Sequence, residues 1–126
     1  MLVAVGIPFY EGKCLLSQRA GNWPETDFFE FPSAVLEEFD TEFTLEDALE
    51  ERIFEISGCR GRFFARFPAF CCEKYPNVRF FPFGFCVENF KKGREKNARW
   101  VDFYKICKMK LSSQSVMLVK FLKKIL

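Results

Sequence analysis

Two glutamates, Glu51 and Glu55, are the clearest candidates for chemistry in this sequence because they stand four residues apart in a stretch with helical character. Residues at this spacing lie on one face of a helix, so the two carboxylates are expected to be neighbours. Paired carboxylate oxygens suit a divalent cation such as Mg²⁺, which prefers hard oxygen ligands. The alternative is an ordinary acidic, solvated helix face, and both interpretations stay open at this point.

The helix that positions these glutamates is predicted from its apolar spacing. Thr44 is expected to cap its start, and the Ser57-Gly58 pair is expected to end it. Between them, apolar side chains recur at helical spacing: Leu45, Ala48, Leu49, Ile53 and Ile56. This stripe predicts a helix with one buried face.

The absence of histidine excludes two common kinds of nucleophilic catalysis. Without histidine the chain can have neither a Ser-His-Asp triad nor a Cys-His nucleophile pair. Six cysteines are present, but no Cys-x-x-Cys pair occurs, so a structural zinc site is not expected. Most of the cysteines stand in apolar segments, where cysteine behaves as a small hydrophobic residue.

The length of 126 residues predicts a single domain over residues 1–126, and 49% hydrophobic residues supply a substantial core. No basic and apolar leader opens the sequence, and no apolar run approaches the length of a membrane span. We therefore expect a soluble, cytoplasmic protein without a membrane partner.

Charge is distributed unevenly along the chain. Residues 1–55 carry 13 acidic and 3 basic side chains, whereas residues 56–126 carry 4 acidic and 16 basic ones. This asymmetry fits a cation site beside a wall that attracts phosphate. It also fits a small domain whose two halves simply pair with each other.

The stretch around the predicted helix resembles the signature of the Nudix hydrolases, and within them the MutT-like nucleotide pyrophosphohydrolases. Residues 51–59 read ERIFEISGC, at the place of the family's Arg-Glu-apolar-any-Glu-Glu-any-Gly-apolar ending, and the strand before it reads FEFPSA. Residues 4–19 are similar to the family's first hairpin, and residues 112–126 to its closing helix. The resemblance thus covers nearly the whole chain.

The resemblance implies a fold and an activity. The fold is an α/β/α sandwich in which a mixed sheet lies between the signature helix and a C-terminal helix. The activity is pyrophosphohydrolysis of nucleoside di- or triphosphates or related diphosphates, with Mg²⁺ or Mn²⁺ as cofactor. Water attacks a phosphorus atom, and the cation is held here by Glu55 and Glu51, with Glu95 in a later loop as a further catalytic candidate. The implied partner is a nucleotide or a nucleoside diphosphate-linked small molecule.

Three residues are implied to hold that nucleotide. Arg19 ends the first hairpin, at the place where MutT-like proteins contact the nucleotide with an arginine. Phe31 matches an aromatic position near the base, and Gln114 falls where relatives read the base edge with Asn or Asp. The amide of Gln offers the same donor and acceptor on a longer arm.

The sequence departs from the family at its metal ligands. Arg52 and Ile56 stand where two of the three signature glutamates are expected, so only Glu55 keeps its carboxylate. An isoleucine supplies no ligand, and an arginine repels a cation. These changes predict weak or impaired hydrolysis. The alternative function is a catalytically inactive Nudix-fold module that binds a nucleotide or a protein partner.

The basic and aromatic segment after Gly58 has two interpretations. Arginines interleave with phenylalanines in RGRFFARFPAFCC, as in surfaces on which nucleic-acid bases stack. Alternation with a period of two is also typical of half-buried strands. The family resemblance favours strands, so nucleic-acid binding is not the preferred prediction. Further strands are predicted at residues 2–9, 13–18, 78–87 and 100–106.

Overall fold

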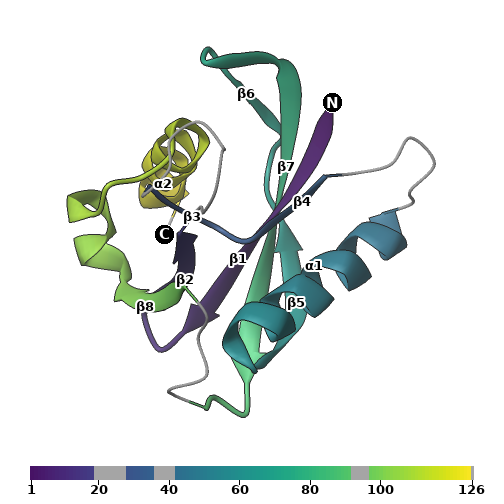
Figure 1. The fold of residues 1–126 in the computed structure, drawn as a ribbon, viewed down its shortest axis with the longest axis vertical. Coiled ribbons are helices and arrows are strands. Elements are labelled where there is room, and N and C mark those ends of the chain that lie inside the picture. Colours follow the sequence, from purple (N-terminus) through teal and green to yellow (C-terminus); the bar gives the residue numbers. More distant parts are fainter. Residues whose placement is uncertain (19–27, 36–41, 92–96, 126) are drawn as a thin grey trace.

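The computed structural model describes residues 1–18, 28–35, 42–91 and 97–125. In these ranges the chain forms one eight-stranded sheet, two α-helices and a 3₁₀ helix (Figure 1). The strands are β1 (Leu2–Tyr10), β2 (Lys13–Gln18), β3 (Phe29–Glu30), β4 (Ser33–Val35), β5 (Arg60–Arg66), β6 (Phe70–Cys72), β7 (Tyr75–Glu88) and β8 (Ala98–Asp102). The helices are α1 (Glu42–Ser57), η1 (Phe103–Lys108) and α2 (Ser113–Ile125).

The sheet is mixed, and β1 and β7 form its centre. These two strands run parallel, with Val5 opposite Pro82. All other pairs are antiparallel: β2 and β4 pair with β1, β5 and β6 pair with β7, and β3 and β8 pair with β2. The sequence prediction of a central apolar strand at residues 78–87 is therefore confirmed, within a longer strand.

Each face of the sheet is covered by one α-helix. Side chains alternate between the faces of a strand, and β1 shows this alternation directly. Ala4 packs in one core with Leu49 of α1, whereas Val3 and Val5 pack in a second core with Leu118 of α2. The α/β/α sandwich predicted from the resemblance is thus confirmed, and Figure 1 shows the two helices apart from each other with the sheet between them.

Helix α1 follows its apolar stripe. Four of the five predicted positions are buried, namely Leu45, Leu49, Ile53 and Ile56, while Ala48 is exposed. The helix ends as expected, because Gly58 takes a positive φ of 71° and its N–H donates to the carbonyl of Phe54 at 2.8 Å. The predicted cap at Thr44 is wrong, since α1 already begins at Glu42.

Both ends of one predicted strand are also corrected. The strand expected over residues 100–106 stops at Asp102, because its carboxylate accepts a hydrogen bond from the N–H of Tyr104 at 3.0 Å and begins η1. β8 also begins earlier, at Ala98. The turn that leads into β7 lies at residues 73–74, and β7 begins at Tyr75.

Cysteines occupy two kinds of position. Three of them are buried, and burial raises the pKa of the Cys14 thiol to about 12, so that it remains a neutral, apolar group. The other three, Cys71, Cys86 and Cys107, are exposed, which the prediction from apolar segments did not anticipate. All six are free thiols. Neither α-helix has the length and apolar character within the described ranges to cross a membrane.

Candidate functional site

The second half of α1 carries three charged side chains on its solvent face. Because Leu49 and Ile53 turn into the core, the positions between and beyond them point outward. Glu51, Arg52 and Glu55 occupy this outward face and line a cleft. We call these three residues the helix end of the cleft.

Both glutamates of the helix end are paired with arginines. Arg52 Nη1 lies 3.4 Å from Glu55 Oε2, one helical turn away on the same helix. Glu51 Oε2 lies 3.5 Å from Nη1 of Arg60, the first residue of β5. The guanidinium of Arg60 also stacks over the ring of Phe54 at 3.9 Å, which fixes its position. The two carboxylates are therefore electrically compensated.

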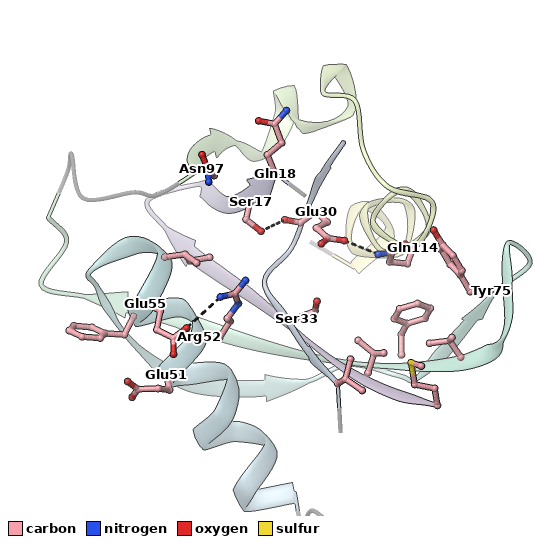
Figure 2. A pocket seen from close by; sticks show the side chains of 17 residues that line it. Ser17, Gln18, Glu30, Ser33, Glu51, Arg52, Glu55, Tyr75, Asn97 and Gln114 are labelled. Atoms are coloured by element: carbon pink, nitrogen blue, oxygen red, sulfur yellow. Dashed lines mark hydrogen bonds and ion pairs between the residues drawn. The ribbon is translucent and has the colours of Figure 1, made fainter. Parts of the chain in front are cut away.

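A second polar pair lies across the cleft. Gln114, in the first turn of α2, donates from Nε2 to Oε2 of Glu30 in β3 at 3.0 Å. We call Glu30 and Gln114 the strand end of the cleft. Figure 2 shows this pair and the Arg52–Glu55 pair as separate groups, with the segment that carries Ser33 between them in this view.

Backbone hydrogen bonds hold the strand end together. The N–H of Phe29 donates to the carbonyl of Lys110 at 2.6 Å, and the N–H of Ser112 donates to the carbonyl of Phe29 at 2.9 Å. These bonds join β3 to the segment that leads into α2. The first turn of α2 is thus held beside Glu30 although 84 residues separate Glu30 from Gln114.

The Glu30 carboxylate fixes the orientation of the Gln114 amide. An ionised carboxylate only accepts hydrogen bonds, so the NH₂ group must face Glu30 and the amide oxygen must face away from it. That oxygen is buried and has no partner in the described part of the chain, and the residue as a whole is only 7% exposed. A buried acceptor without a donor is unfavourable, so the strand end is prepared to accept a hydrogen bond.

One cleft of about 1080 Å³ joins the two ends. This is at the upper limit of the volumes usual for small-molecule sites. β1, β2, β3, β4, β7, α1 and α2 contribute to its walls. Besides the residues named above, its lining includes Val3, Ser17, Gln18, Ser33, Val35, Phe54, Ile56, Tyr75, Val78, Phe80 and Asn97. The lining thus combines apolar side chains with polar and charged groups that could orient a small molecule.

The residues of the helix end do not match the metal site that the resemblance implies. Among the described residues, no three Asp, Glu, Cys or His side chains gather where they could hold a metal ion. Ile56 offers no ligand, and Arg52 places a permanent positive charge against Glu55. A divalent cation at this place would have to compete with that charge.

The structure brings together three of the residues predicted from the sequence. Glu51, Glu55 and Gln114 all line the same cleft. Phe31 is 1% exposed and belongs to the core packed against α2, so it has almost no surface for a ligand. The contact of Phe31 with a base remains a prediction. The burial of the Phe31 side chain argues against it. Arg19 and Glu95 lie outside the described residues.

Two features of the site were not predicted from the sequence. Glu30 was read only as part of a strand, although a carboxylate between phenylalanines in FFEF marks an isolated polar position in an apolar run. The pairing of Arg60 with Glu51 joins residues that the sequence places in separate elements. Both depend on tertiary contacts that no local pattern encodes.

The arginines of β5 pair with acidic residues. Arg60 and Arg66 form ion pairs with α1, to Glu51 at 3.5 Å and Glu46 at 3.8 Å. Arg62 pairs with Glu88 at 3.3 Å on the neighbouring strand. The segment forms strands, as the family resemblance predicted, and two of its three arginines pair with the acidic half of the chain.

Comparison of the fold with solved structures gives close matches over almost the whole chain. The NUDIX domain of Shewanella oneidensis NrtR, solved with ADP ribose, has a TM-score of 0.73 and 14% identity, covering 98% of this chain and 86% of that one. A NUDIX hydrolase from Nitrosomonas europaea has a TM-score of 0.70 and 15% identity, covering 94% and 85%. These neighbours establish that the chain has the Nudix fold.

A third neighbour is a two-activity enzyme. The Francisella tularensis NMN adenylyltransferase/ADP ribose pyrophosphatase, complexed with AMP and a Mn ion, has a TM-score of 0.71 and 14% identity. The match covers 98% of this chain and 41% of that one. No family model and no curated protein sequence matches the chain. Nudix hydrolases are thus its structural neighbours, at identities that establish the fold alone.

Proposed function

We propose that the cleft binds a nucleoside diphosphate-linked small molecule, with the base or nucleoside at the strand end and the diphosphate at the helix end. The observation that carries this proposal is the joining of two different polar environments in one cavity. Gln114 and Glu30 offer directional hydrogen bonds, whereas Arg52 offers charge, and all three line the same cleft. A nucleotide has the same division between a hydrogen-bonding base and a charged phosphate chain.

The hydrogen-bonding groups at the strand end favour a ligand that donates. The buried oxygen of Gln114 is an acceptor, and the carboxylate of Glu30 is another. A base offers suitable donors in an exocyclic amine or a ring N–H. Two structural neighbours were solved with ADP ribose or with AMP, which supports a ligand of this chemical class.

Hydrolysis of the bound diphosphate is proposed to be weak. Nudix-type hydrolysis, as the resemblance implies it, needs a cation that polarises the phosphate and activates water. Here Glu55 and Glu51 would supply the ligands, and each is paired with an arginine. The second candidate function is a binding module without turnover, and the Arg52–Glu55 ion pair is the observation that favours it.

Calorimetric titration tests the proposed function. ADP ribose and the common nucleoside diphosphates are titrated into the protein in EDTA and again in Mn²⁺, and release of AMP or phosphate is followed in the same samples. We expect saturable binding of at least one of these compounds and slow or no release. Absence of binding for every compound under both conditions would refute the proposal, and rapid Mn²⁺-dependent release would refute the weak hydrolysis.

A further inference from the structure

Arg52 lies at the place where the resemblance implies a metal-binding carboxylate. A positively charged side chain thus stands where a negatively charged one would bind a cation. Its side chain lines the cleft and is 48% exposed, so a ligand can reach the guanidinium. A guanidinium stays protonated at any physiological pH and presents parallel N–H donors that match a phosphoryl group. The residue therefore has the charge and the geometry to bind a phosphate directly.

The present partner of Arg52 is easy to displace. A single contact of 3.4 Å joins Arg52 to Glu55, and the Glu55 side chain is 57% exposed. Exposed single-contact ion pairs contribute little to stability because water screens them. A diphosphate carries more negative charge than one carboxylate and can accept two parallel hydrogen bonds from the guanidinium, so it competes well for Arg52.

Glu51 does not oppose such an anion. Its carboxylate is paired with Arg60 at 3.5 Å, and Arg60 is itself held over the Phe54 ring. The formal charges of Glu51, Arg52, Glu55 and Arg60 cancel, so the helix end lacks the excess negative charge that attracts a divalent cation. An approaching diphosphate meets Glu51, which is already compensated, and Arg52, which can turn to it and leave the exposed Glu55 carboxylate to water.

We propose that this cleft binds the diphosphate of its ligand without a divalent metal ion, through direct contact between the Arg52 guanidinium and the phosphoryl oxygens. Arg60 acts as a positioning residue that keeps the Glu51 carboxylate compensated. The inference rests on the proposed function, because it assigns the phosphate contact within the same cleft. It goes further in stating that the metal implied by the resemblance is dispensable for binding.

The test uses inorganic pyrophosphate and ADP, titrated by calorimetry into the protein in EDTA and in Mn²⁺. Arg52→Met is compared with Arg62→Met, which removes an equally charged side chain from an exposed ion pair outside the cleft lining. In EDTA we expect both ligands to bind the parent protein and Arg52→Met to weaken that binding about 10- to 100-fold, as for the loss of a hydrogen bond to a charged group. Arg62→Met is expected to stay within about twofold.

The outcomes separate the two proposals. Binding of ADP that requires Mn²⁺, or equal affinities of the Arg52→Met and Arg62→Met proteins for pyrophosphate, would overturn the metal-free contact while leaving nucleotide binding intact. Failure of ADP ribose and all nucleoside diphosphates to bind under either condition would overturn the proposed function itself. Because Arg52 and Arg62 are both exposed, both variants are expected to fold, and circular dichroism verifies this.

Discussion

The two ends of the cleft are built in opposite ways. At the strand end, Gln114 is 93% buried and its amide is oriented by Glu30, with backbone hydrogen bonds between β3 and the entry to α2 behind it. At the helix end, the Arg52–Glu55 pair is about half exposed and consists of one long contact. The strand end is held by several directional hydrogen bonds, whereas the helix end is held by exposed ion pairs.

This difference shows which part of the site tolerates change. A buried hydrogen bond is costly to break because the abandoned partner loses solvation as well as its contact. An exposed ion pair is nearly neutral in stability, so its charges can be replaced without loss of the fold. Arg52, which stands where the resemblance implies a signature glutamate, belongs to the helix end, where the exchange of an exposed charge is expected to affect chemistry more than folding.

The largest expected effect comes from restoring the carboxylates of the helix end. Arg52→Glu combined with Ile56→Glu removes the positive charge beside Glu55 and adds two oxygen ligands. We expect Mn²⁺ affinity to rise on the order of a hundredfold, since affinity for hard cations follows the number of charged ligands. Phosphate release from nucleoside diphosphates should rise with it. Calorimetry and a phosphate-release assay on the same samples measure both.

The control for this double variant is Arg52→Met with Ile56→Met, which removes the charge but adds no ligand. Ile56 is buried against the core of α1, so the glutamate version is expected to unfold at a lower temperature. A folded double-glutamate protein with no gain in either metal affinity or turnover would contradict the alignment of residues 51–59 with the family signature.

The next effect tests the strand end. Gln114→Leu removes both the buried acceptor and the donor to Glu30, and puts an apolar side chain of similar size in their place. We expect ADP to bind about tenfold more weakly, as for the loss of one ligand hydrogen bond, and pyrophosphate to bind as before. Met117→Leu, an exposed position on the same helix, is the matched control. Equal losses for ADP and pyrophosphate would show that Gln114 does not distinguish base from phosphate.

Much of the fold could be predicted because its signals are local. The apolar runs at residues 2–9 and 13–18 predicted the strands β1 and β2, and the helical stripe predicted α1 up to its glycine stop. The errors fall at element ends. α1 begins two residues before Thr44. The strand ending at Asp102 gives way to η1 because of one hydrogen bond, from Tyr104 N–H to the Asp102 carboxylate, that periodicity does not encode.

The site was predictable only in part, and for a related reason. Glu51 and Glu55 follow from helical spacing, and Gln114 followed from resemblance; the structure places all three on one cleft. The partners of Glu51 and Gln114, unlike the Arg52 partner of Glu55, come from elsewhere in the chain. Glu30 reaches Gln114 across 84 positions, and Arg60 reaches Glu51 from another element. Charge compensation of Glu51 is thus a tertiary property, whereas that of Glu55 is local.

The smallest expected effect tests whether the helix end exchanges partners as proposed. Glu55→Gln removes the negative charge that competes for Arg52, so pyrophosphate in EDTA should bind about two- to fivefold more tightly, in keeping with the modest value of an exposed ion pair. The free energy of unfolding should change by less than about 1 kcal/mol for the same reason. Glu88→Gln is the matched control, because it breaks the exposed pair with Arg62 outside the cleft lining. Tighter binding in both variants would assign the gain to overall charge, and weaker binding in Glu55→Gln alone would mean that Glu55 holds Arg52 in its binding position.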